Sequence, residues 1–92
     1  MIDRPEPAPD VVVEDLDDDV CLYRSDIDEV LVLNQSAGDV WRLADGQLTV
    51  AAIAAQLAAV YQADTATVQA DVRTVVDDLA ARGYLVERAA QP

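Results

Sequence analysis

Carboxylates are the side chains with the most capacity for chemistry in this sequence, and in one stretch they are spaced like calcium ligands. The first, third, fifth and twelfth positions of a calcium-binding loop are matched by Asp15, Asp17, Asp19 and Asp26. The sixth position holds Val20 instead of the glycine that the sharp turn of such a loop needs, and residues 20–24 are typical of a strand. We therefore expect a solvated acidic turn here and no metal site.

Catalytic chemistry has few other candidates. The chain contains no histidine and no lysine, so the commonest general base and the amine nucleophile are both absent. The pair Asp77-Asp78 is expected on an exposed helix flank, where solvated charge is ordinary. The single cysteine, Cys21, stands in an apolar run and is expected to be a buried, inert thiol. We predict that the protein is not an enzyme, with no catalytic residue and no cofactor.

The charge of the chain excludes one class of partner. Acidic residues number 18 against 6 basic ones, which gives a net charge of -12. Proteins bind nucleic acids largely through Lys and Arg that neutralise phosphates, so we expect no nucleic-acid partner. No apolar stretch approaches the roughly 20 residues of a membrane span, and the acidic, proline-rich start differs from a secretory signal. We expect a cytoplasmic protein with no membrane partner, monomeric when free.

Three short strands are expected in the first third of the chain. Residues 11–14, 20–24 and 29–33 are rich in β-branched and aromatic side chains, and short polar links separate them. Links of this kind favour antiparallel pairing of consecutive strands. The preceding residues contain three prolines, so we expect residues 1–10 to be a flexible lead-in that contributes nothing to the core.

After residue 34 the apolar side chains recur at helical spacing. A short first helix is expected to begin at Asn34 or Ser36 and to end at Asp45-Gly46. Thr49 is a natural N-cap for a second helix. Its apolar face is predicted to consist of Val50, Ile53, Ala54, Leu57 and Tyr61.

A third and longer helix is expected from Asp64, its N-cap, to about Arg82. Gly83 follows at the position where a left-handed residue commonly ends a helix. Residues 84–86 resemble a brief extended segment. The order of elements predicts an α+β fold of winged helix-turn-helix-like type, a three-stranded antiparallel sheet followed by three helices. This domain covers residues 11–86, and residues 87–92 form a C-terminal tail.

Residues 29–33 are the most informative segment, because their apolar side chains must occupy both faces of a strand. The five residues are Glu29, Val30, Leu31, Val32 and Leu33. As the third strand of a meander the segment lies at a sheet edge, and an apolar edge is either packed by the rest of the chain or free to dock a partner. An extended peptide could add to it by β-augmentation. The pattern leaves both alternatives open, and it does not tell which strand face would line a groove.

The third helix has a second apolar-polar flank beside its core stripe. At 100° per residue, Val72, Val76 and Leu79 form one narrow face. An adjoining flank carries Val68, Asp71, Val75, Asp78 and Arg82. Either this flank is the wall of a groove with polar anchors, or it is the edge of a wide core face with solvated acids.

An ordered set of residues, spread over residues 11–86, resembles the PqqD-like family. The matching positions are Val32-Leu33-Asn34-Gln35-Ser36-Ala37, Val40-Trp41-Arg42-Leu43, Asp45-Gly46, Thr49-Val50, Ile53-Ala54, Leu57, Tyr61, Asp71-Val72, Leu79 and Arg82-Gly83-Tyr84-Leu85. Members of that family are recognition elements for ribosomally synthesised and post-translationally modified peptides (RiPPs) in bacterial natural product biosynthesis. Agreement of this length is more specific than any single short motif.

The resemblance implies a non-catalytic peptide chaperone. It implies that the leader segment of a precursor peptide pairs with residues 29–33 as an added strand and lies against the third helix. The partner enzyme would be a radical SAM maturase or a leader peptidase. The peptide-binding residues predicted on this basis are Glu29, Val30, Leu31, Val32, Leu33, Val68, Asp71, Val72, Val75, Asp78 and Arg82.

Two other functions fit the same architecture. A winged-helix regulator would read DNA with the third helix, where DNA readers cluster Arg and Lys. The face of this helix offers one cation among acids: Gln69, Arg73, Asp77 and Asp78. A protein-docking adaptor without a peptide ligand would use the same apolar edge. DNA binding in a gel shift at low salt would support the regulator, whereas binding to a leader peptide in the same assay series would not.

Overall fold

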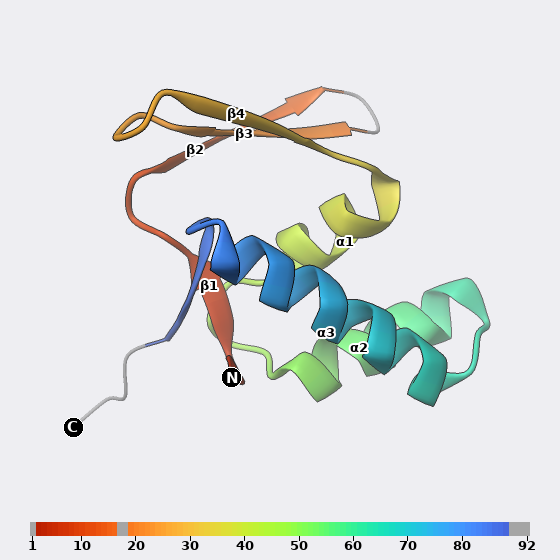
Figure 1. Ribbon diagram of the computed structural model, residues 1–92. Helices are drawn as coiled ribbons and strands as arrows, with labels where there is room; N and C mark the ends of the chain where they lie inside the picture. The colour runs from red at the N-terminus through yellow and green to blue at the C-terminus, as the bar shows by residue number, and fades with distance from the viewer. Residues whose placement is uncertain (1, 17–18, 89–92) are drawn as a thin grey trace.

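The computed structural model describes residues 2–16 and 19–88, and its main sheet has the predicted order. Strands β2 (Val11–Leu16), β3 (Asp19–Arg24) and β4 (Glu29–Leu33) pair antiparallel in the order β2-β3-β4. The helices lie together below one face of this sheet (Figure 1). The predicted α+β fold, a three-stranded antiparallel sheet followed by three helices, is confirmed.

Each helix begins at a residue whose side chain caps it. The helices are α1 (Gln35–Leu43), α2 (Val50–Tyr61) and α3 (Thr65–Ala81). The side-chain oxygens of Asn34, Thr49 and Asp64 each accept a hydrogen bond from a backbone N–H three residues further on. Asn34, not Ser36, is therefore the cap of α1. Gly83 has a φ of 85°, as expected of the residue that ends α3.

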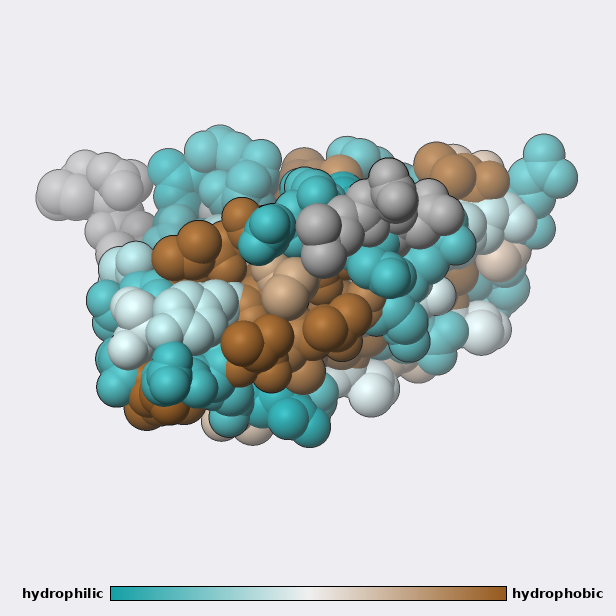
Figure 2. Space-filling view, turned by 90° about the horizontal axis from the view of Figure 1, so that it is seen from above, coloured by the Kyte–Doolittle hydropathy of each residue, from teal (hydrophilic) through white to brown (hydrophobic). Residues whose placement is uncertain are grey.

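The register of β3 decides which side of the sheet meets the core. Val20 and Leu22 are buried against the helices, whereas Cys21 and Tyr23 alternate with them on the other side. This other side is the outer face of the sheet, and it carries Val12, Cys21, Tyr23, Val30 and Val32. Figure 2 looks down on it and shows hydrophobic side chains gathered there. Cys21 is partly exposed, so the expectation of a buried thiol is wrong.

The first ten residues contain a strand that the sequence did not predict. β1 (Pro5–Pro7) pairs antiparallel with β5 (Leu85–Glu87) in a separate two-stranded sheet. Pro5 is fully buried, and Ile2 packs against the core. The expectation that the lead-in contributes nothing to the core is therefore wrong. We call residues 2–8, with their pairing to residues 84–88, the N-terminal clasp.

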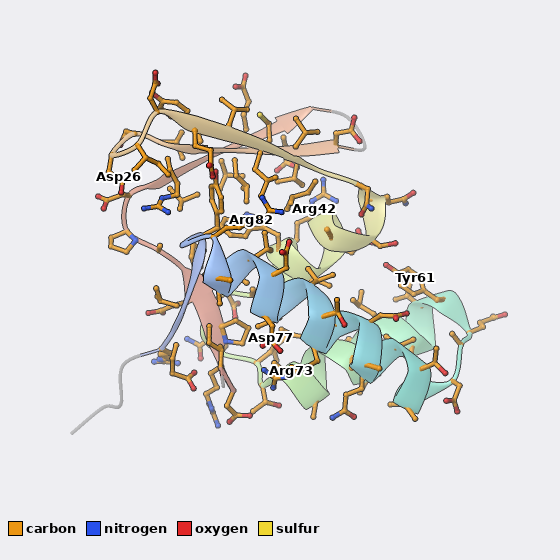
Figure 3. The ribbon with its side chains drawn as sticks, viewed as in Figure 1. Asp26, Arg42, Tyr61, Arg73, Asp77 and Arg82 are labelled. Carbon is orange, nitrogen blue, oxygen red and sulfur yellow. The ribbon has the colours of Figure 1, made fainter. Side chains whose placement is uncertain are left out.

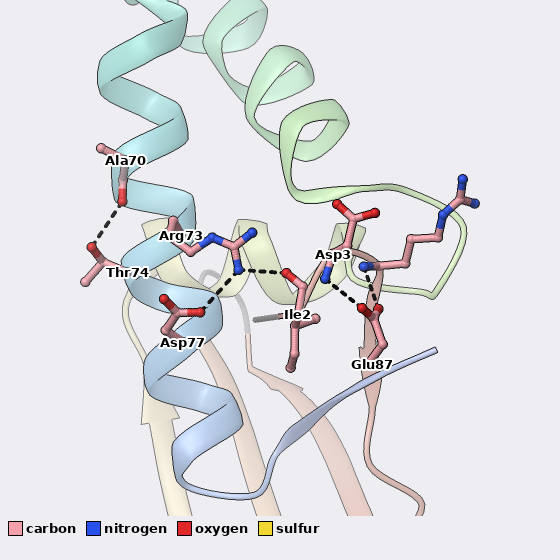
Figure 4. A network of polar contacts seen from close by, with 8 residues as sticks. Ile2, Asp3, Ala70, Arg73, Thr74, Asp77 and Glu87 are labelled. Carbon is pink, nitrogen blue, oxygen red and sulfur yellow. Dashed lines mark hydrogen bonds and ion pairs between the residues drawn. The ribbon is translucent and has the colours of Figure 1, made fainter. Parts of the chain in front are cut away.

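Polar contacts hold the clasp to α3 and to the loop before α2. Arg73 and Asp77 lie one helical turn apart on α3 (Figure 3). A guanidinium nitrogen of Arg73 donates to the carbonyl of Ile2 at 2.7 Å and pairs with Asp77 at 3.2 Å (Figure 4). The Glu87 carboxylate accepts the backbone N–H groups of Asp3 and Arg4, at 2.9 and 2.7 Å. These two amides hold the pKa of Glu87 below its ordinary value.

Two expectations from the sequence extend beyond the described residues. Asp17 of the calcium-like pattern lies outside them, as do residues 89–92 of the expected tail. Of the other aspartates in that pattern, Asp15 and Asp19 lie in strands, and Asp26 pairs with Arg24 at 2.6 Å. Over residues 2–16 and 19–88, no helix has the length and apolar character needed to cross a membrane.

Candidate functional site

The two faces of β4 have different surroundings. Leu31 and Leu33 pair across from Leu22 and Val20, so they lie on the side of the sheet that meets the helices. Leu33 is buried and Leu31 is half-buried. Val30 and Val32 point to the outer face and are exposed. This answers what the sequence left open: any groove between the sheet and α3 is lined by Leu31 and Leu33.

β4 is also an edge strand. It pairs with β3 on one side, and no strand among the described residues pairs with its other side. The backbone N–H and C=O groups that point away from β3 are thus available to an added strand. β2 forms the opposite edge of the same sheet.

A hollow of about 330 Å³ lies beside β4. Strand, turn and helix all contribute to its walls. The lining residues are Leu31, Leu33, Asn34, Ala37, Thr74, Val75, Asp78, Leu79 and Arg82. Apolar side chains thus make up most of the lining, and Asp78 and Arg82 are its charged residues. Such a combination of apolar walls and few polar groups is typical of a binding site.

A second hollow of about 230 Å³ continues along the N-terminal half of α3, where α1 and α2 close around it. Its lining is again mostly apolar. The residues are Ser36, Val40, Leu57, Tyr61, Ala63, Thr67, Val68, Asp71, Val72 and Val75. Val75 lines both hollows, so they meet at this side chain. We call the two hollows together the α3 groove.

The α3 groove brings together most of the predicted peptide-binding residues. They are Leu31, Leu33, Val68, Asp71, Val72, Val75, Asp78 and Arg82. The prediction did not separate the two faces of β4, however. The side chains of Val30 and Val32 face away from the groove, and the carboxylate of Glu29 is occupied by a hydrogen bond from Tyr84. Their side chains therefore do not line the groove, and these three residues would meet an added strand through their backbone and on the outer face of the sheet.

Arginine and aspartate side chains fix the end of the groove where α3 meets the sheet. Arg82 donates through Nε to Asp78 at 3.1 Å, and the carbonyl of Arg82 accepts from Arg24 at 2.6 Å. Arg24 also pairs with Asp26, and this hydrogen bond lowers the pKa of Asp26 and raises that of Arg24. The contacts tie the β3–β4 turn to the end of α3, and Arg82 lies between the two elements (Figure 3).

Two tyrosines bear on the groove although the sequence did not predict them as site residues: Tyr61 lines it, and Tyr84 lies beside it. The Tyr84 hydroxyl donates to Glu29 at 2.8 Å, and burial together with this bond raises the pKa of Tyr84 to about 12. Tyr61 lines the second hollow, and its hydroxyl donates to Asp39 on α1. That hydrogen bond raises the pKa of Tyr61 to about 12. The apolar spacing of α2 placed Tyr61 in the core, but its ring is substantially exposed.

The model of the family described as coenzyme PQQ synthesis protein D (PqqD) matches residues 11–85. The chain belongs to the PqqD family. The resemblance noted in the sequence is therefore confirmed, and the match covers the three-stranded sheet, all three helices and the start of β5.

Curated relatives from the PqqD family agree with this membership. Two PqqA binding proteins of Rhodopseudomonas palustris, from strains CGA009 and BisB5, are 42% and 40% identical to this chain over 60 residues. Each alignment covers 65% of this chain and 59% of the relative, so the chain spans less than two thirds of their length.

Solved structures share the fold over nearly the whole chain. TbiB1, determined in complex with the TbiA(beta) leader peptide, superposes with a TM-score of 0.82 at 26% identity, over 94% of this chain and 99% of TbiB1. The NMR structure of the PqqD truncation of Methylobacterium extorquens PqqCD, a stand-alone RiPP recognition element, gives a TM-score of 0.75 at 27% identity. That alignment covers 90% of this chain and 88% of the truncation.

Proposed function

We propose that this chain is a non-catalytic peptide chaperone that binds the leader segment of a ribosomally synthesised precursor peptide and presents it to a modifying enzyme. One observation carries the proposal: the unpaired edge of β4 runs beside the α3 groove in a chain of the PqqD family. The structurally similar TbiB1 is bound to a leader peptide, and the curated relatives are PqqA binding proteins. Both support a peptide as the ligand.

Strand addition supplies the affinity. A leader strand beside β4 would hydrogen-bond to the backbone groups that point away from β3. Because the pleat continues into an added strand, every second leader side chain would point to the same side as Leu31 and Leu33. These side chains would enter the first hollow of the α3 groove. The leader that fits has apolar residues at alternate positions.

The second hollow supplies specificity beyond the strand. Its apolar floor, which includes Val68 and Val72, would take an apolar side chain of the leader. Asp71 lines this hollow and favours Arg or Lys nearby in the leader, whereas Asp78 in the first hollow is already paired with Arg82. The net charge of -12 acts in the same direction. High salt should slow the association of a basic leader.

The partner is a radical SAM maturase or a leader peptidase. Once the leader is held on a chaperone that also binds the enzyme, encounter of the core peptide with the enzyme becomes nearly intramolecular. The chaperone then raises the effective concentration of the substrate and takes no part in bond chemistry. The absence of histidine and lysine from the chain is consistent with this division of roles.

Calorimetric titration with the synthetic leader of the cognate precursor peptide, once the neighbouring reading frames identify it, tests the proposal. Val75→Asp puts a charge where the two hollows meet and should weaken binding at least about tenfold. Val75→Thr, which keeps the shape, should weaken it less. Gln69→Asp adds the same charge at an exposed position of α3 that lines neither hollow, so it is the matched control. Equal affinity of Val75→Asp and Gln69→Asp, both folded, would contradict the proposal.

A further inference from the structure

The outer face of the sheet carries apolar side chains at positions where an antiparallel sheet usually presents polar ones to water. The register aligns Val12, Tyr23 and Val30 in one row, and Cys21 with Val32 in the next. The three valines are 58%, 59% and 63% exposed in the order Val12, Val30, Val32. Scattered exposed apolar residues are common, but a contiguous patch marks an interaction site.

No element of the chain covers this patch among the described residues. The helices and the N-terminal clasp all lie on the opposite side of the sheet (Figure 1), and the view onto the outer face shows the hydrophobic area open to solvent (Figure 2). Every second side chain of an added leader strand would point to the outer face beside Val30 and Val32, whereas Val12, Cys21 and Tyr23, on β2 and β3, lie farther from the leader. A leader and a second partner could therefore be bound at once.

The border of the patch indicates the chemistry of that partner. Glu14 follows Val12 on the same face of β2, and Asp19 precedes Cys21 on the same face of β3. Asp28, in the β3–β4 turn, accepts a hydrogen bond from the Tyr23 hydroxyl. A second copy of the chain would present an acidic border to an acidic border, with a charge of -12 on each copy. Electrostatic repulsion opposes such a dimer. The acidic border instead favours a partner protein whose apolar contact surface is bordered by Arg and Lys.

We infer that the outer face docks the modifying enzyme, through an apolar contact surface on the enzyme that is bordered by basic residues. This inference rests on the proposed function and names the second interface that this function needs. The leader then occupies the edge of β4 and the α3 groove, while the enzyme occupies the opposite side of the same strands. Leader and enzyme would then be separated only by the thickness of a single β-sheet.

Cys21 provides a probe in the unaltered protein, because it is the only cysteine of the chain and lies within the patch. Its rate of alkylation by a maleimide can be measured alone, with the synthetic leader, and with the purified cognate modifying enzyme, a radical SAM maturase or a leader peptidase. The enzyme should slow alkylation at least about fivefold, and the leader alone should leave the rate within about twofold. Unchanged alkylation at an enzyme concentration that saturates binding would overturn the inference.

A variant that introduces a positive charge supplies the second measurement. Val12→Arg places a cation in the patch, and Val60→Arg makes the same change at an exposed valine on α2. We expect Val12→Arg to weaken enzyme binding at least about tenfold and Val60→Arg to have little effect, with leader affinity retained by both. Equal enzyme affinity of the two variants, or sedimentation showing that the patch pairs two copies of the chain, would overturn the docking inference. Loss of leader binding by the unaltered chain would instead contradict the proposed function.

Discussion

The hydroxyl of Tyr84 donates a hydrogen bond to Oε1 of Glu29 at 2.8 Å, and this contact joins the first residue of β4 to the segment between α3 and β5. The ring of Tyr84 is fully buried, and the guanidinium of Arg24 lies over it at 5.8 Å from the ring centre. One wall of the α3 groove is thereby fixed to the other at the end where Arg82 stands. The width of the groove at this end depends on a side chain outside the groove itself.

Tyr84→Phe should cost about 1 kcal/mol of unfolding free energy, because it removes one hydrogen bond and keeps the ring. The pKa of Tyr84 is raised from 10.0 to about 12, so the protonated phenol stabilises the fold. That contribution is complete below pH 10 and is lost as the pH rises toward 12. Denaturant unfolding at neutral and alkaline pH checks this. The difference in stability between the unaltered chain and Tyr84→Phe should shrink with rising pH, and a constant difference would contradict the assignment.

Gly83→Ala should destabilise the chain by about 1–2 kcal/mol or more, because the left-handed φ of 85° disfavours any residue with a Cβ. The added Cβ would also lie 2.2 Å from a guanidinium nitrogen of Arg24, which would have to move. A double-mutant cycle with Arg24→Ala separates the two causes. In the Arg24→Ala background, the loss of stability caused by Gly83→Ala should fall to the part that comes from the left-handed backbone. An unchanged loss would show that the Arg24 guanidinium moves aside without an energetic cost.

Glu87→Gln should remove an acid sensitivity of the N-terminal clasp. The pKa of Glu87 lies below its ordinary 4.5 in the fold, so its contribution to stability is present above pH 4.5 and is lost as the pH falls through the lowered pKa. Hydrogen exchange at the amides of Asp3 and Arg4, corrected for intrinsic rates, checks this. Protection should fall in acid for the unaltered chain and stay flat for Glu87→Gln, and equal pH profiles would contradict it.

The helices could be predicted because their signals are local. Asn34, Thr49 and Asp64 each cap a helix through a side chain that reaches only three residues along the chain, and Gly83 ends α3 through its own backbone conformation. The α3 flank from Val68 to Arg82 followed from helical periodicity in the same way. All five residues of this flank line the α3 groove.

The N-terminal clasp could not be predicted, because it depends on pairing between the two ends of the chain. Prolines argue against a strand, yet in β1 they stand where no N–H is needed. The carbonyl of Arg4 accepts from the N–H of Arg88, and the N–H of Ala8 donates to the carbonyl of Tyr84. The carbonyl of Pro5 points away from β5 and accepts from the N–H of Gly46. Pro5 and Pro7 thus occupy positions that do not donate to β5.

The orientation of β4 also required coordinates. Val30, Leu31, Val32 and Leu33 are all apolar, so alternation gave no preference between the two faces. Only the register with β3 assigns Leu31 and Leu33 to the groove and the two valines to the outer face. The same register leads to the second interface that we infer.

Hydrogen exchange of the backbone amides, followed by NMR with and without the synthetic leader, tests strand addition to β4 most directly. We expect the β4 amides that point away from β3 to become protected when the leader binds, and the methyl resonances of Leu31, Leu33 and Val75 to shift at the same time. The amides of β2, at the opposite edge of the sheet, should exchange as before. Protection along β2, or binding of the leader with no new protection in β4, would contradict the account.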